Sequence, residues 1–178
     1  MQKRSETYEK LVREHGRGLY RLAHRLCGDP CLAEDLVQEC YLEAWRSLPE
    51  LRSLERARAW LVQILRHRFH RALRARSRRP RVQSLPESLG WVPPERDWAL
   101  EQALEQLEPH YREPFLLVFM EGYRCREVAE LLDLPIGTVL SRIHRARTRL
   151  KALLTAFEES GKLRAIRGSS RGAGMGRP

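Results

Sequence analysis

The chain has 178 residues, and its 33 Lys and Arg against 23 Asp and Glu give a formal net charge of +10. This length allows one domain or two small ones, and the longest apolar run, residues 115–120, is far too short to span a membrane. The first ten residues show no export signal, so we expect a cytoplasmic protein without membrane insertion. The positive charge favours a polyanionic partner, with nucleic acid ahead of a membrane surface.

The first part of the chain predicts three amphipathic helices. A first apolar stripe begins near Tyr8 and is ended by Gly28. Asp29 and Pro30 are suited to the cap and the first position of a second helix, whose stripe ends around residues 47–49. A third helix is expected at about Glu55 to Arg74. Since no segment shows the period-two pattern of a strand, the sequence predicts an all-α fold.

Positive charge gathers at the end of the third helix and in the residues just after it. Residues 66–81 contain eight arginines and two histidines and no acid. We interpret them as a helix end that contacts a polyanion, with a solvated basic stretch as the alternative, because unpaired like charges repel unless phosphate neutralises them. The next residues contain Pro80, Pro86, Pro93 and Pro94, which predicts a linker. Fully extended, about 18 residues reach ~60 Å, so two DNA contacts nearly two helical turns apart are within reach.

Residues 123–150 predict a helix-turn-helix. A helix at Cys125–Leu132 is followed by a turn at Asp133 and Leu134 and by a second helix at Ile136–Leu150. Apolar residues recur along the second helix in steps of three and four, which makes one buried stripe. Polar and basic residues occupy the other side at the same steps: Thr138, Ser141, Arg142, Arg145 and Arg149.

The charge on this second helix favours DNA binding over a purely structural helical hairpin. Residues 134–151 contain five basic residues and no acid, whereas residues 97–133 contain nine acids and three arginines. A solvated structural helix more often mixes both signs at i, i+4 spacing. The full prediction is two small helical domains, residues 1–78 and 97–157, joined by a flexible linker at 79–96 and followed by a disordered basic tail at 158–178. The C-terminal domain is the helix-turn-helix.

The four cysteines of the chain predict free thiols rather than disulfides in a cytosolic protein. His24, Cys27 and Cys31 lie close in sequence, but their spacing does not match a zinc site, so we expect buried thiols, with metal binding or redox sensing as the alternative. The sequence also offers no clustered carboxylate metal site, no glycine-rich phosphate loop and no nucleophile set. We therefore expect no metal, no cofactor and no enzymatic activity.

Three sequence blocks together resemble the extracytoplasmic function (ECF) sigma factors, a family of bacterial RNA polymerase subunits. They are CGDPCLAEDLVQECYLEAW at residues 27–45, ARAWLVQILRHRF at residues 57–69, and GYRCREVAELLDLPIGTVLSRIHRARTRL at residues 122–150. They occur in the family's order and at its separations, and the resemblance covers about Tyr8 to Leu154. It implies an alternative sigma factor that binds core RNA polymerase and directs promoter-specific transcription initiation.

The resemblance also implies a role for each block. The first would bind the clamp helices of the largest polymerase subunit, through residues on or near the exposed side of the second helix: Asp35, Gln38, Glu39 and Tyr41. The second, with the loop at residues 48–56, would capture the melted −10 non-template strand, through Arg52, Ser53, Trp60, Arg66, His67, Arg68 and Arg71. The third would read the −35 element in the major groove, through Thr138, Ser141, Arg142, Arg145 and Arg149.

The implied partners are core RNA polymerase, through its clamp helices and flap, promoter DNA and an anti-sigma factor. Three positions depart from the family pattern. Leu140 stands where a lysine is common, which removes one DNA contact, His67 stands where an asparagine is common, and Cys125 stands where a small hydroxyl or an aromatic residue is more usual. Two other functions compete with this one. The first is a helix-turn-helix regulator that binds duplex DNA without polymerase, and the second is an enzyme that acts on nucleic acid.

Overall fold

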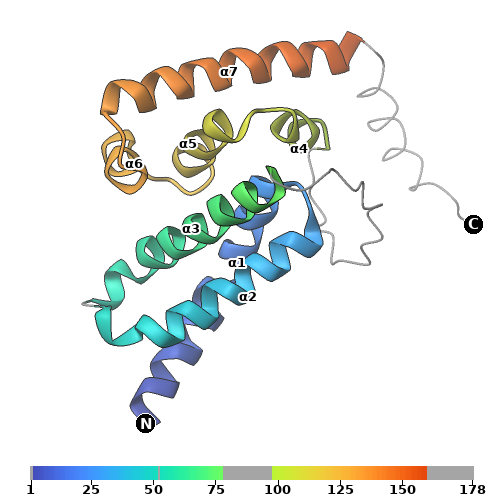
Figure 1. Ribbon diagram of the computed structural model, residues 1–178. Helices are drawn as coiled ribbons and strands as arrows, with labels where there is room; N and C mark the ends of the chain where they lie inside the picture. The colour runs from blue at the N-terminus through green and yellow to red at the C-terminus, as the bar shows by residue number, and fades with distance from the viewer. Residues whose placement is uncertain (1, 52, 78–97, 160–178) are drawn as a thin grey trace, which may run out of the picture. The chain divides into compact units, whose positions relative to one another are not determined.

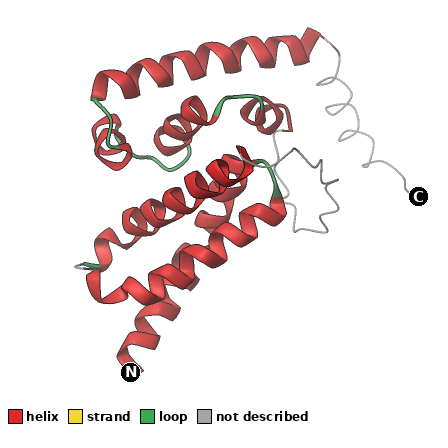
Figure 2. Ribbon diagram, in the orientation of Figure 1, coloured by secondary structure: helices red, strands yellow, loops and turns green. Residues whose placement is uncertain are grey.

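A computed structural model describes residues 2–51, 53–77 and 98–159, and these fall into two compact units, one in each half of the chain. Every element within these ranges is helical and none is a strand (Figure 2). The predicted all-α fold of two small helical domains is therefore confirmed. None of the helices in the described ranges is both long and apolar enough to cross a membrane.

The first unit is a bundle of three long helices that lie side by side (Figure 1). These are α1 (Gln2–Cys27), α2 (Pro30–Ser47) and α3 (Ala57–Ser77), and two short 3₁₀ helices, Leu48–Glu50 and Leu54–Arg56, connect α2 to α3. The helices meet over a core of fully buried side chains that includes Leu22, Leu26, Leu36, Leu61, Val62, Leu65 and Phe69. Burying aliphatic and aromatic side chains of this size contributes about 1.5–3 kcal/mol each.

The junction between α1 and α2 forms as its sequence predicts. Gly28 adopts a φ of 70°, a left-handed conformation that costs glycine little and ends α1. The carboxylate of Asp29 then accepts a hydrogen bond from the backbone N–H of Leu32 at 3.1 Å, and Pro30 occupies the first helical turn. This cap fixes where α2 begins and therefore which of its residues face outward.

The second unit is built around one long helix, α7 (Ile136–Glu159), against which three shorter helices pack (Figure 1). These are α4 (Trp98–Glu105), α5 (Pro109–Phe119) and α6 (Cys125–Leu132). The predicted helix-turn-helix is the pair α6 and α7, and Asp133 in its turn has a φ of 52°. The start of α6 is capped by Glu127, whose carboxylate accepts from the backbone N–H of Arg124 at 2.7 Å.

A buried arginine holds the corner between α4 and α5. The Arg112 guanidinium donates to the backbone carbonyls of Glu105 at 2.5 Å and Leu107 at 2.7 Å. Carbonyls at the end of a helix have no hydrogen-bond partner within the helix, and a buried carbonyl without a partner costs free energy. The Arg112 side chain supplies the missing donors. The corner in turn sets the position of Glu108 and Tyr111 at the start of α5.

The structure differs from the sequence expectation in several places. Helix α7 continues to Glu159, so the expectation that residues 158 and 159 belong to a disordered tail is wrong. Trp45 and Phe119 are exposed to 39% and 50%, although large aromatic side chains generally pack into a core. The predicted linker at 79–96 and the remainder of the predicted tail lie outside the described residues.

Candidate nucleic-acid interface

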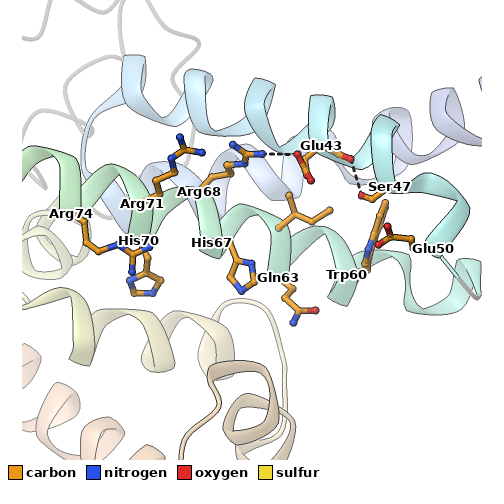
Figure 3. A pocket seen from close by; sticks show the side chains of 11 residues that line it. Glu43, Ser47, Glu50, Trp60, Gln63, His67, Arg68, His70, Arg71 and Arg74 are labelled. Carbon is orange, nitrogen blue, oxygen red and sulfur yellow. Dashed lines mark hydrogen bonds and ion pairs between the residues drawn. The ribbon is translucent and has the colours of Figure 1, made fainter.

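A groove of about 780 Å³ runs along α3, with its opposite wall formed by the end of α2 and the 3₁₀ turn after it. Four of the residues predicted to contact the melted strand line it, namely Trp60, His67, Arg68 and Arg71. Figure 3 shows them along one side of α3, with Trp60 toward one end of the row and Arg74 at the other. The remaining lining residues are Glu43, Ser47, Glu50, Gln63, Ile64, His70 and Arg74.

Trp60 is held firmly at its end of the groove. Its half-buried ring packs against a small apolar cluster formed by Leu11, Leu48 and Ala57, which joins α1, the 3₁₀ turn and α3. The part of the ring that lines the groove is therefore presented in a fixed orientation. A ring held this way loses little side-chain entropy when a planar ligand stacks on it.

Arg68 links the two walls of the groove. Its guanidinium forms an ion pair with Glu43 at 2.7 Å and another with Glu39 at 3.5 Å, both from α2 (Figure 3 shows the first). The Arg68 side chain is only 21% exposed, so these pairs are partly protected from solvent screening. Arg68 therefore fixes the spacing of α2 and α3 and already has anionic partners in the protein. Sequence reasoning named Arg68 but missed Glu43.

Three other residues were predicted for the strand path, and one of them, Arg66, does not lie where it was expected. Arg66 is buried, at 7% exposure, and does not line the groove, so its expected place on the strand path is wrong. One helical step of about 100° separates it from His67 and turns it toward the packed side of α3. Arg52 lies outside the described residues. Ser53 caps the second 3₁₀ turn, where its hydroxyl accepts from the backbone N–H of Glu55 at 3.2 Å.

The outward face of α2 exposes Asp35, Gln38 and Glu39, as the sequence predicts. Tyr41 differs, because it is 8% exposed and its expected place on or near that face is wrong. Its ring meets that of Tyr8 edge-on at 6.2 Å, and its backbone carbonyl accepts from the Tyr8 hydroxyl at 3.3 Å. Burial raises the pKa of the Tyr41 hydroxyl well above its ordinary value, so it stays protonated.

The predicted reading face of α7 is largely open to solvent. Ser141, Arg145 and Arg149 are exposed and Thr138 and Arg142 are half-buried, while the apolar stripe of Val139, Ile143, Ala146 and Leu150 is buried. The Ser141 hydroxyl donates to the carbonyl of Thr138 at 2.9 Å, one turn earlier in the helix. The guanidinium groups of Arg142 and Arg145 are thus presented from a helix whose opposite side is fixed in the core.

A cluster at the start of α5 holds the far end of this face. Arg149 pairs with the carboxylate of Glu108 at 2.5 Å, and its guanidinium lies 4.7 Å from the centre of the Tyr111 ring. Arg145 donates to the Tyr111 hydroxyl at 3.4 Å. Sequence reasoning missed Glu108 and Tyr111, because Glu108 and Arg149 are 41 positions apart and no local pattern joins them.

This cluster makes a prediction about acid stability. The hydrogen bond from Arg149, with smaller attraction from Arg149 and His110, lowers the pKa of the Glu108 carboxyl. A lowered pKa stabilises the fold above the ordinary carboxyl value of about 4.3, and that contribution is lost as the pH falls through the lowered value. We expect Glu108→Gln to reduce the melting temperature at pH 7, and this deficit to shrink as the pH falls from 4 through the lowered pKa of Glu108. Melting curves of both proteins across this range test it, and an equal deficit at both ends would contradict the assignment.

The cysteines make a second prediction. Cys40 is buried, and burial raises the pKa of its thiol to about 12, whereas Cys31 is exposed. The expectation of buried thiols is therefore correct for Cys40 and wrong for Cys31. Since the thiolate is the reactive form, iodoacetamide at pH 8 should label Cys31 in the native protein and Cys40 only after unfolding. Mass spectrometry of the digested protein measures this, and equal labelling of both in the native state would contradict it.

Within the described ranges no group of three His, Cys, Asp or Glu side chains could hold a metal ion.

Comparison with known proteins places this geometry in a family. Residues 11–79 match the model of Sigma-70 region 2, and residues 97–150 match the model of Sigma-70, region 4. The chain is 34% identical over 163 residues to the ECF RNA polymerase sigma factor SigL of Mycobacterium tuberculosis, covering 86% of this chain and 90% of that protein. The chain belongs to the ECF RNA polymerase sigma factors, which confirms the resemblance seen in its sequence.

Further relatives agree with this assignment. ECF RNA polymerase sigma factor SigE of Mycolicibacterium smegmatis is 35% identical to the chain over 160 residues. The alignment covers 83% of this chain and 62% of the length of SigE. The sigma factor RpoE of Bartonella quintana, solved in complex with the anti-sigma factor NepR, superimposes with a TM-score of 0.68 at 28% identity, covering 83% of this chain and 96% of that one. CnrH, solved with the cytosolic domain of CnrY, gives a TM-score of 0.60 at 26% identity, covering 84% and 88%.

Proposed function

We propose that this chain joins core RNA polymerase in the cytoplasm and directs it to promoters with two spaced elements. Residues 1–78 bind the polymerase and trap the melted −10 element, residues 97–157 grip the −35 element, and residues 79–96 span the distance between them. The chain contributes binding and no catalysis of its own. The observation that carries the proposal is the groove on α3, which combines a fixed aromatic ring with arginine and histidine side chains.

The groove suits a single strand better than a duplex. An unstacked base can lie on the exposed part of the Trp60 ring, and the phosphates that follow can meet His67, Arg71 and the end of α3. Stacking of a base on an aromatic ring contributes about 1 to 3 kcal/mol. This offsets the few kcal/mol that unstacking a base costs. Capture of flipped bases can therefore stabilise a melted promoter without ATP hydrolysis.

Arg68 has a different part in this proposal. Its ion pairs with Glu43 and Glu39 hold the two walls of the groove at a constant distance. A phosphate that meets Arg68 therefore shares its guanidinium with these carboxylates or displaces one of them. Arg66 is buried and acts through the packing of α3 rather than through the strand.

The −35 element is assigned to the outward side of α7. In a helix-turn-helix the first residues of the second helix meet base edges in the major groove, and arginine pairs with guanine through two hydrogen bonds. Thr138, Ser141, Arg142 and Arg145 lie within the first three turns. Arg149 lies about 20 Å along the axis from Ile136 and is paired with Glu108. A phosphate that meets Arg149 therefore shares its guanidinium with Glu108 or displaces that carboxylate.

The acidic face of α2 is the proposed contact for polymerase. Asp35, Gln38 and Glu39 project from it, and their charge suits a basic surface on the clamp helices, with the flap contacted by the second unit. Tyr41 supports this face from beneath, since it is buried. The two structurally similar proteins, the sigma factor RpoE and CnrH, were solved with partner proteins, and the partner of RpoE is the anti-sigma factor NepR. We propose that an anti-sigma factor also holds this chain inactive.

Run-off transcription with purified core polymerase tests the proposal. The template is selected from a pool of random promoter-length duplexes by rounds of transcription in the presence of the chain. A discrete transcript that requires both core enzyme and this chain is the expected result. A chain that enriches duplex sequences equally well without polymerase is a regulator of the helix-turn-helix type, and the proposal would then be wrong.

A further inference from the structure

Two large apolar side chains are exposed on the first two turns of α7. Ile136 is 45% exposed and Leu140 is 51% exposed. They are four residues apart and therefore neighbours on the same side of the helix. The buried stripe of α7 is complete without them, since Val139 and Ile143 fill the core beside them at 0% and 8% exposure. The packing of the second unit thus does not account for this pair.

The position of the pair places it at the proposed DNA contact. Successive residues turn by about 100°, so Ile136 and Leu140 lie on one flank of α7, Arg142 on the other, and Ser141 between the two flanks. The major groove is about 12 Å wide, which is close to the diameter of a helix with its side chains. A helix inserted there has both flanks against the groove walls. The polar and basic flank can hydrogen-bond to base edges, and the apolar flank needs an apolar contact.

The chemistry of the major groove offers one such contact. Every base edge there presents hydrogen-bond donors or acceptors, and the single apolar group is the C5 methyl of thymine. We propose that Ile136 and Leu140 read thymine methyl groups within the −35 element. This inference rests on the proposed function and deepens it, because it states which bases one flank of α7 selects. Leu140 stands where the family commonly has a lysine that contacts DNA. In this proposal Leu140 contacts DNA in another way and helps to determine which sequence is selected.

Charge favours DNA over a protein as the occupant of this flank. The five basic residues of α7 within residues 136–151 all follow the pair, and Arg147 lies two turns beyond Leu140 on the same flank. An apolar pair followed along its helix by positive charge and no acid complements a polyanion with exposed methyl groups better than it complements the mixed surface of a protein. The rise between the two residues is about 6 Å, so the pair can cover one or two neighbouring base pairs.

Replacement of thymine by deoxyuridine tests the proposal, since this change removes the methyl group and nothing else. The full chain is assembled with core polymerase, a −35 element is selected from duplexes randomised in that region, and each thymine of the selected element is replaced in turn. At one or two positions we expect a loss of affinity of about fourfold, the factor expected for burying one methyl-sized group. Leu140→Ala should abolish this loss at its own position, whereas Leu140→Met should retain it.

Phe119→Ala is the matched control, because Phe119 is an equally exposed apolar residue of the second unit that lies on α5. It should leave the response to deoxyuridine unchanged. The inference is overturned if the selected element contains no thymine that responds, or if Leu140→Ala keeps the wild-type response. It is also overturned if Leu140→Ala weakens polymerase binding equally on both DNAs, since the flank would then be a protein contact. Failure to select any element contradicts the proposed function itself and is recognised before a thymine is replaced.

Discussion

Replacing Phe69 with alanine is expected to destabilise the first unit by about 3–5 kcal/mol, the range for deleting a fully buried aromatic ring. Phe69 is 1% exposed and is among the largest side chains in the core that α1, α2 and α3 share. The cavity cannot close without moving α3, and α3 carries most of the groove. Urea denaturation followed by circular dichroism measures the loss of stability. We expect promoter opening to fall with it.

His67→Ala separates stability from DNA contact on the same helix. His67 is exposed and lines the groove two residues before Phe69. Exposed substitutions of this kind usually change stability by less than about 0.5 kcal/mol. We therefore expect a normal denaturation curve together with weaker binding of a single-stranded −10 oligonucleotide by the polymerase complex. A Phe69→Ala protein of normal stability would contradict the bundle as described.

Arg142→Ala and Arg145→Ala are each expected to weaken recognition of the −35 element by about 1–3 kcal/mol, the cost of losing an arginine contact to a base. Arg145 is exposed on the side of α7 that faces away from its buried stripe, and Arg142 is half-buried on one flank of that stripe. The proposed contact with the clamp helices of polymerase lies in the other unit, on α2, and no polymerase contact is assigned to these two arginines. Core binding should therefore remain at the wild-type level. Filter binding with matched and mutated −35 duplexes measures the first effect, and competition for core polymerase measures the second.

Lys151→Ala provides the control for charge alone. Lys151 is also exposed and basic, but it lies two or more turns beyond Arg142. Removing it should weaken binding to all duplexes to a similar, smaller extent and should lower the salt dependence, as expected for a phosphate contact. If Arg142→Ala and Arg145→Ala behave in the same way as Lys151→Ala, they do not read bases. If they reduce core binding equally, the assignment of α7 is wrong.

Local signals predicted the helices well. The cap at Asp29 and Pro30 and the turn at Asp133 were both visible in the sequence, because a cap or a turn depends on residues within a few positions of one another. The apolar stripe of α7 likewise identified its buried side correctly. These features are decided by the chain's own backbone and need no knowledge of distant segments.

Side-chain environments that depend on distant segments were not predictable in the same way. Tyr41 and Arg66 carry polar groups and were placed at the surface, yet neighbouring helices cover both of them. The pairing of Arg149 with Glu108 joins α7 to α5, and that of Arg68 with Glu43 joins α3 to α2. Helical periodicity gives the direction in which a side chain leaves its own helix. It does not give the partner that the packing brings to meet it.

The reactivity of −10 thymines toward permanganate tests the central claim most directly, because this reagent oxidises unpaired thymines. The measurement is made on a selected promoter with core polymerase and the chain, without nucleotides. The account predicts reactive thymines on the non-template strand only when both proteins are present, and a weaker signal for Trp60→Ala. A promoter that the chain binds but leaves fully paired in the presence of polymerase would contradict it.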